Sequence, residues 1–180
     1  EKWFDCGDVG ILFYAVCFSE KNVVRELLEN LQFEFKGEEY TRRLESRVRE
    51  DGYVALGIPG RSTVLMSAAM LASTEIVCML LESGADVTCL DIMGNDAFML
   101  ASVFGRHDNL QCWLERVKEY DLEKCNSVLG ATSIFAAVNM GSNKFATVSV
   151  LLKQGARVDA MTHAGSSVLM AACANEDSGP

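Results

Sequence analysis

Short blocks of apolar residues recur along the chain at nearly constant intervals. The blocks RSTVLMSAA, GNDAFMLAS, GATSIFAAV and GSSVLMAAC begin at residues 61, 94, 130 and 165, which places them 33, 36 and 35 residues apart. The first three are each followed by a second apolar block, at residues 76–87, 110–117 and 148–159. A period of this length indicates a chain built from repeated supersecondary units.

Each repeat contains two apolar stretches of helical character and then a turn that contains glycine. Gly84 and Gly155 follow the second stretch in their repeats. Glycine is the residue most suited to the left-handed conformation that ends a helix. The pattern therefore predicts an all-α fold of helix-turn-helix units joined by hairpin-like loops.

The repeat from Arg61 resembles the ankyrin repeat, whose consensus reads roughly G-x-T-P-L-H-x-A-A and then V-x-x-L-L-x-x-G-A-D. The matching residues are Thr63, Leu65, Ala68, Ala69, Val77, Leu80, Leu81, Gly84, Ala85 and Asp86. A degenerate repeat fits from Asp8, through Leu12, Ala15, Val24, Leu27 and Leu28. The resemblance implies an ankyrin-repeat solenoid, which we expect to form one domain over residues 1–180, with repeats starting near residues 8, 61, 94, 130 and 165.

These repeats also depart from the ankyrin consensus. Its proline position holds Ile11, Val64, Ala97, Ser133 or Val168, and its histidine position holds Phe13, Met66, Met99, Phe135 or Met170. Without proline the first helical turn is less preset. Without histidine we expect the side-chain hydrogen bond to the neighbouring backbone to be lost.

An insertion at about residues 31–60 separates the first repeat from the second. Within it, residues 41–50 predict a short helix that concentrates Arg42, Arg43, Arg47 and Arg49. Arginine matches carboxylate and phosphate geometry, so this cluster is a candidate site for an acidic partner or a phosphate. Nearby acidic residues favour the alternative of a self-paired, solvated face; they are Glu38, Glu39, Glu45 and Glu50.

Composition narrows the classes of function. The 180 residues are 49% hydrophobic, which suffices for a core, and the formal net charge of −9 repels nucleic acid. No apolar run approaches the roughly 20 residues of a membrane-spanning helix. The last repeat has one helix and no second one, so we expect a piece of a longer chain, with further chain or a partner covering Val168, Leu169 and Met170.

Seven cysteines form an odd set with no C-x-x-C spacing. This spacing argues against a disulfide framework or a zinc ribbon. Because Cys78 and Cys112 sit in apolar stretches, we expect all seven to be reduced, and the protein to be intracellular, in the cytoplasm or an organelle interior. Cys89 and Cys125, in turns, are the most reactive candidates.

No constellation for catalysis or for a cofactor emerges. His107 and His163 are the two histidines, and nothing near them supplies the three or four ligands of a metal site. A nucleophile with an adjacent base is also missing, as is any glycine-rich phosphate-binding motif. We therefore expect a protein that is not an enzyme and has no cofactor.

The resemblance places partner-binding residues on hairpin tips and on the first helix of each repeat, where the fold itself imposes little constraint. Most residues at these positions are apolar, which is typical of an interface. The candidate partner-binding residues are Leu90, Ile92, Met93, Asn95, Val103, Phe104, Met70, Leu71, Val128, Leu129 and Met140. We expect a protein-protein interaction or scaffold module. The alternatives are a regulatory or targeting domain of a longer enzyme and a structural subunit of a large complex.

Overall fold

A computed structural model describes residues 8–140 and 143–176. Its contacts divide the chain into two compact bodies, residues 1–92 and 93–180. We call them the N-terminal body and the C-terminal body and describe each by itself. The single domain expected over residues 1–180 stays a prediction.

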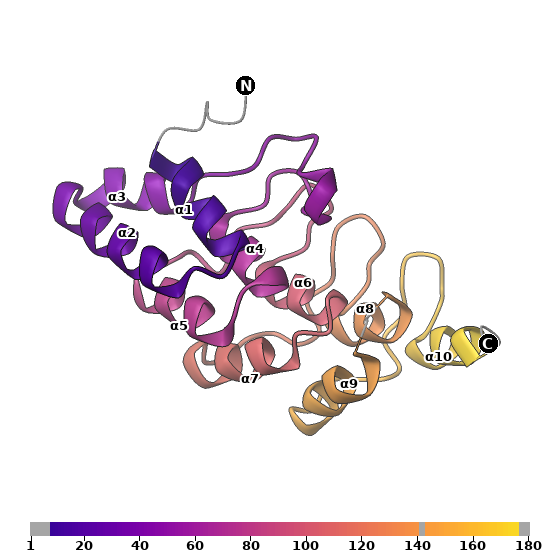
Figure 1. The fold of residues 1–180 in the computed structure, drawn as a ribbon. Helices are drawn as coiled ribbons and strands as arrows, with labels where there is room; N and C mark the ends of the chain where they lie inside the picture. Colours follow the sequence, from indigo (N-terminus) through magenta and orange to yellow (C-terminus); the bar gives the residue numbers. More distant parts are fainter. Residues whose placement is uncertain (1–7, 141–142, 177–180) are drawn as a thin grey trace. The chain divides into compact units, whose positions relative to one another are not determined.

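The N-terminal body is made of two helical layers and the predicted insertion (Figure 1). Helix α1 packs against α4, while α2 packs against α5, and each neighbouring pair within a repeat is also in contact. Helix α3 contacts both α1 and α2. The helices are α1 (Asp8–Cys17), α2 (Lys21–Glu34), α3 (Gly37–Leu44), the 3-10 helix η1 (Val54–Leu56), α4 (Val64–Leu71) and α5 (Thr74–Glu82).

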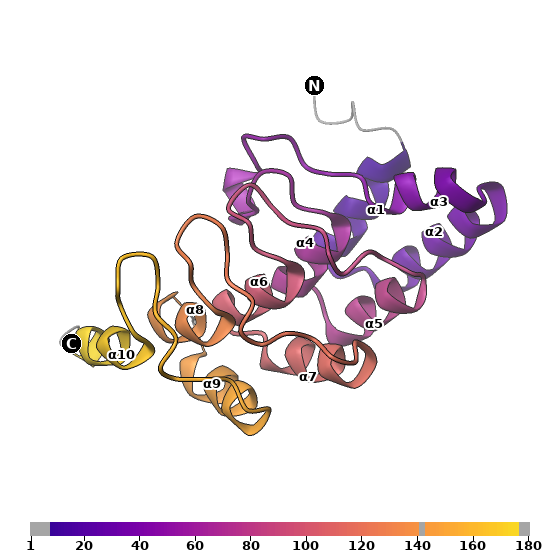
Figure 2. The same ribbon diagram turned by 180° about the vertical axis from the view of Figure 1, so that it is seen from behind.

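The C-terminal body repeats this layered arrangement. Helix α8 contacts both α6 and α10, and in the second layer α7 contacts α9 (Figure 2). Long loops precede α8 and α10, and each is closed at its base by an isolated β-bridge, Cys125–Thr132 and Met161–Ser167. The helices are α6 (Ala97–Val103), α7 (His107–Arg116), α8 (Ser133–Met140), α9 (Lys144–Lys153) and α10 (Val168–Glu176).

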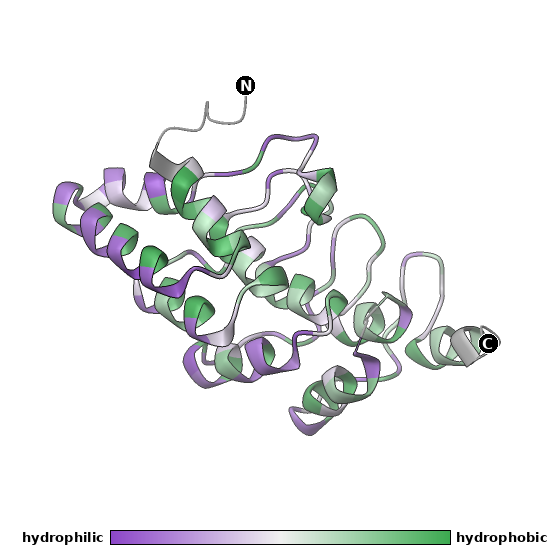
Figure 3. Cartoon of the chain, in the orientation of Figure 1, coloured by the Kyte–Doolittle hydropathy of each residue, from purple (hydrophilic) through white to green (hydrophobic). Residues whose placement is uncertain are grey.

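Apolar residues of the first helices form most of each core. Figure 3 shows α4, α6 and α8 as largely hydrophobic, whereas α7 carries hydrophilic residues along its outer side. In the C-terminal body, Phe98 and Trp113 are almost completely buried, and the ring of Tyr120 lies 4.3 Å from that of Phe98. Burial of apolar side chains, of which these are the largest, is the dominant favourable term in folding.

One polar residue begins the first helix of four successive repeats. The side chain of Thr63 accepts a hydrogen bond from the Met66 N–H, and that of Asp96 accepts one from Met99. Thr132 and Ser167 accept in the same way from residues three positions later. These caps satisfy backbone donors that the first helical turn leaves without a partner.

The expected loss of the histidine hydrogen bond is wrong for the repeat from Arg61. The Thr63 N–H donates to the sulfur of Met66 at 3.4 Å, so the thioether takes the acceptor role within the buried turn. Together with the Thr63 cap, this closes a reciprocal pair of hydrogen bonds between Thr63 and Met66. Methionine sulfur can accept a hydrogen bond, although weakly. Met66 therefore keeps this turn closed in place of the consensus histidine.

The described residues confirm the predicted all-α, ankyrin-like fold. They contain helices and isolated bridges but no extended strand. Over residues 8–140 and 143–176, no helix has the length and apolar character required to cross a membrane.

Candidate protein-interaction surface

Three loops of the C-terminal body are joined edge to edge by hydrogen bonds. The Asn126 amide donates to the Asn95 side-chain oxygen at 3.0 Å, and the Ser127 hydroxyl reaches the Met93 carbonyl at 3.4 Å. Along the next edge, the His163 N–H donates to the Leu129 carbonyl at 2.9 Å. The loops around residues 93–95, 126–131 and 161–167 thus form one continuous edge.

Glycine is required where these loops approach one another. Gly94 and Gly130 both have positive φ, 79° and 66°. A Cβ atom on Gly94 would lie 2.6 Å from the Ser127 nitrogen, and one on Gly130 would lie 2.9 Å from the His163 nitrogen. Neither distance is compatible with a side chain, so the glycines allow the loops to pack directly on each other.

The tips of these loops expose apolar side chains. Met93, Val128 and Leu129 are 38%, 49% and 45% exposed, as a partner-binding role requires. Met161, on the third loop, is also exposed, and sequence reasoning missed it. Met161 is the bridge residue of the third loop and holds the position of Cys125 in the loop before it, which an alignment of the loops shows. We call Met93, Val128 and Leu129 the loop-tip surface.

The other candidate residues are divided between surface and core. Met140 is exposed at the end of α8, and Val103, Phe104 and Leu71 are half-buried at the ends of their helices. Asn95 is buried and holds the Asn126 amide. Met70 is only 1% exposed, so its assignment to a partner-binding face is wrong: it belongs to the core of the N-terminal body.

In the N-terminal body, Leu90 and Ile92 lie on the loop that follows α5. Both are exposed, at 38% and 46%. The Ile92 N–H donates to the Gly60 carbonyl, and the Arg47 guanidinium donates to the Leu90 carbonyl at 2.7 Å. The loop that carries these two apolar side chains is therefore held against the insertion.

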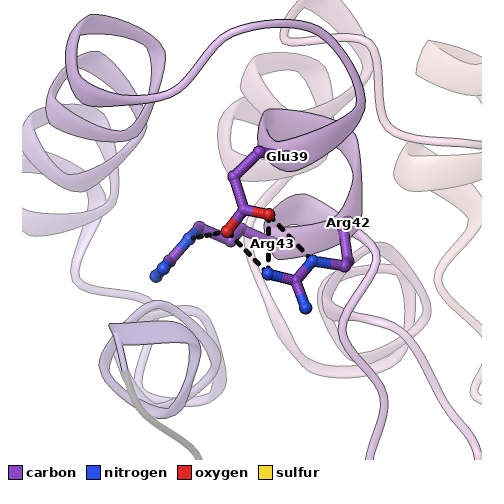
Figure 4. Close-up of polar contacts among 3 residues, drawn as sticks. All are labelled: Glu39, Arg42 and Arg43. Atoms are coloured by element: carbon purple, nitrogen blue, oxygen red, sulfur yellow. Dashed lines mark hydrogen bonds and ion pairs between the residues drawn. The ribbon is translucent and has the colours of Figure 1, made fainter.

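The arginine-rich helix lies earlier than the sequence predicts. It spans Gly37–Leu44, not residues 41–50, because Glu38 and Glu39 then occupy its first turn and the arginines its last, as the helix dipole favours. Glu39 accepts hydrogen bonds from both Arg42 and Arg43 (Figure 4). Hydrogen bonds from these arginines, first Arg42 and then Arg43, hold the pKa of Glu39 below its ordinary value. This half of the cluster is self-paired.

Glu45 has a structural role that the sequence did not indicate. Instead of pairing with arginine, it accepts the backbone N–H of Asp86 at 2.6 Å. Glu123 accepts the backbone N–H of Arg157 at 2.9 Å in the C-terminal body. Each glutamate stands two residues before a bridge residue, and each donor follows a Gly-Ala pair. The same contact therefore occurs in two loops, and an alignment of these loops can find it.

The two candidate reactive cysteines are poorly suited to nucleophilic chemistry. Burial and then the neighbouring Glu45 raise the pKa of Cys89 to about 12. Burial, followed by Glu123 and Asp121, raises the pKa of Cys125. Because the thiolate is the reactive form, both thiols are less reactive than an ordinary cysteine, contrary to the sequence expectation.

The histidines and carboxylates do not assemble into a metal site within the described part of the chain. His107 contacts the Asn143 amide at 3.4 Å through Nδ1 and Asp108 through Nε2. His163 is exposed, and its backbone N–H binds the neighbouring loop.

The expectation that all seven cysteines are reduced is wrong for two of them. Cys78 and Cys112 are in disulfide-bonded form, whereas Cys17, Cys89, Cys125 and Cys173 are free. Cys6 lies outside the described residues. Disulfides persist mainly in oxidising compartments, so cysteine chemistry no longer supports the intracellular location, which stays a prediction.

Alkylation of the denatured chain should test this state directly. Without a reductant, we expect label on Cys17, Cys89, Cys125 and Cys173, and none on Cys78 and Cys112. After reduction, peptides that contain the latter two should gain one label each. Full labelling of both before reduction, read by peptide mass spectrometry, would contradict the oxidised form.

Comparison with known proteins identifies one segment. Residues 61–92 match the family model of the ankyrin repeat, and they include helices α4 and α5 and the loop that carries Leu90 and Ile92. No curated protein sequence matches the chain. Residues 61–92 are thus an ankyrin repeat, and the resemblance of the chain to the ankyrin-repeat family is confirmed.

Proposed function

We propose that the chain is a non-catalytic module that binds another protein through the loop-tip surface. Ankyrin repeats are generally protein-protein interaction modules. The observation that carries the proposal is the exposure of Met93, Val128 and Leu129 together on loops that hydrogen bonds join. Adjacent exposed apolar side chains on a folded protein mark an interface.

The fixed backbone of these loops favours binding. The Leu129 N–H donates to the Asn126 side-chain oxygen at 3.1 Å, and its carbonyl accepts from His163. Gly130 allows the two loops to lie in contact. A surface that is ordered before binding loses little conformational entropy when a partner docks, so more of the contact free energy contributes to affinity.

Two observations support a role in binding over catalysis. The thiols of Cys89 and Cys125 have raised pKa values, the opposite of what a nucleophile requires. Met93, Val128 and Leu129, the exposed residues at the loop tips, are large and apolar rather than titratable. An apolar anchor at the centre of an interface is a frequent source of affinity.

The double variant Val128→Ser/Leu129→Ser should weaken partner binding at least tenfold, about 1.4 kcal/mol, because it removes two apolar anchors. The partner is first captured with the wild-type chain, and affinities are then measured with the purified partner by calorimetry. Both side chains are about half exposed, so the thermal unfolding midpoint should change little.

Leu152→Ser is the matched control. Leu152 is 46% exposed, almost the same as Leu129 at 45%, but it lies on α9 away from the loops. Its replacement should leave partner affinity unchanged. Equal losses of partner affinity in the double variant and in Leu152→Ser would show that the loop tips are not the interface.

A further inference from the structure

Part of the arginine cluster is not self-paired. Arg47, Arg49 and Arg61 are all exposed in the N-terminal body. Among the residues that the structure describes, no carboxylate forms an ion pair with Arg49 or Arg61. They stand in a chain whose formal net charge is −9, and Glu50 and Asp51 directly follow Arg49.

Backbone hydrogen bonds hold these arginines on two adjacent backbone segments, residues 47–49 and 61–62. The Arg61 N–H lies 3.1 Å from the Val48 carbonyl and 3.3 Å from the Arg49 carbonyl, and the Val48 N–H donates to Ser62. The Arg47 guanidinium donates to the Arg61 carbonyl at 3.1 Å. The backbones of Arg49 and Arg61 are therefore adjacent and fixed.

Arg61 occupies a backbone conformation that favours glycine. Its φ is +62°, and the corresponding positions of the later repeats are Gly94, Gly130 and Gly165, with φ of 79°, 66° and 76°. A residue that has a Cβ atom is strained in this region of backbone conformation, whereas glycine, which lacks one, is not. Strain that a protein retains at one position points to a function of the side chain.

The loop that carries the apolar residues Leu90 and Ile92 lies against the backbone of this segment. The loop of Leu90 and Ile92 is hydrogen bonded to Arg47 and to Gly60, the residue before Arg61. Both leucine and isoleucine side chains are exposed. A lone phosphate would use only the charges, whereas a peptide with acidic and apolar residues would use both features of this surface.

We propose that Arg49 and Arg61 bind the carboxylates of an acidic peptide segment, with Leu90 and Ile92 contacting its apolar residues. Arg47 positions the loop, since its guanidinium is already engaged with two carbonyls. Arginine suits this role because its planar fork binds a carboxylate through two parallel hydrogen bonds. The inference rests on the proposed function only in that the partner is a protein, and it concerns a different surface.

The test uses the full chain and a fluorescein-labelled peptide of Asp-Glu-Leu repeated three times, with Asn-Gln-Leu repeated three times as the uncharged control. Fluorescence anisotropy should show binding of the acidic peptide alone, and added salt should weaken it. Because the whole chain is acidic, bulk charge opposes this binding, so any affinity arises locally.

Arg61→Gly gives the sharpest result. It removes the guanidinium and relieves the strained φ, so peptide affinity should fall severalfold while the thermal unfolding midpoint rises. Arg49→Gln/Arg61→Gly should lower affinity at least tenfold. Arg42→Gln, which removes an exposed arginine paired with Glu39, should leave affinity unchanged.

Three results would overturn the proposal. They are wild-type affinity in the double arginine variant, equal binding of the two peptides, and tighter binding of inorganic phosphate than of the acidic peptide through the same arginines. The Val128→Ser/Leu129→Ser variant should bind the acidic peptide normally. Failure of this inference is thereby distinguishable from failure of the loop-tip surface to bind its partner.

Discussion

Replacing Asp96 by alanine should lower the free energy of unfolding by about 2–4 kcal/mol, because it removes a helix cap and the buried acceptor of two further donors. Asp96 is 1% exposed and accepts from the Met99 N–H, the Tyr120 hydroxyl and the Lys124 ammonium, each at 2.9 Å. Without the carboxylate, the helix loses its cap and the Tyr120 hydroxyl loses this acceptor, whereas the Lys124 ammonium, on a side chain that is 34% exposed, is hydrated instead. Urea denaturation followed by circular dichroism measures the loss.

Asp159→Ala is the control for the Asp96 variant. Asp159 also pairs with a basic residue, accepting from Arg157 at 2.8 Å, but both side chains are exposed. Exposed ion pairs contribute little because water and salt screen them. If Asp96→Ala lowers the free energy of unfolding no more than Asp159→Ala does, burial does not strengthen the contacts of Asp96.

Leu80→Ala should lower the free energy of unfolding by about 2–5 kcal/mol, the range for a buried leucine whose removal leaves a cavity. Leu80 is completely buried in the ankyrin repeat at residues 61–92. Leu152→Ala, the same chemical change at a 46% exposed site, should stay within about 0.5 kcal/mol of the wild type. Equal losses would contradict the assignment of Leu80 to the core.

Phe104→Ala should lower the free energy of unfolding by an amount between those of Leu80→Ala and Leu152→Ala. Phe104 is half-buried at the end of α6, so truncation removes some core contacts and some exposed surface. If it also contacts the partner, as the sequence predicts, affinity should fall by ~2 kcal/mol. Unchanged affinity, with a loss of stability as large as that of Leu80→Ala, would assign Phe104 to the core alone.

The periodic features of the fold were predictable from sequence because they are local. An apolar stretch, a capping residue before it and a glycine after it are each specified within one repeat. The helices α4, α6 and α8 begin directly after Thr63, Asp96 and Thr132, close to the positions that the aligned blocks indicate.

Contacts between loops were not predictable in the same way. Glu45 binds the backbone of Asp86 and Glu123 binds that of Arg157, and only an alignment of one loop with the next, not the pattern within one repeat, indicates such contacts. The helix Gly37–Leu44 was misplaced because charges at its ends, not an apolar period, determine its bounds. Met70 was misassigned because the family register does not report what packs on a given position in this chain.

The capping residues explain how far these repeats can diverge. At the four cap positions a threonine, an aspartate, a second threonine and a serine perform one task, because each needs to supply only a single oxygen atom. Three chemically different side chains are therefore interchangeable there, and each exchange erases sequence similarity without altering the turn. The position of one oxygen atom is kept while the residue that supplies it changes. A repeat can therefore keep its fold after its sequence no longer matches the consensus.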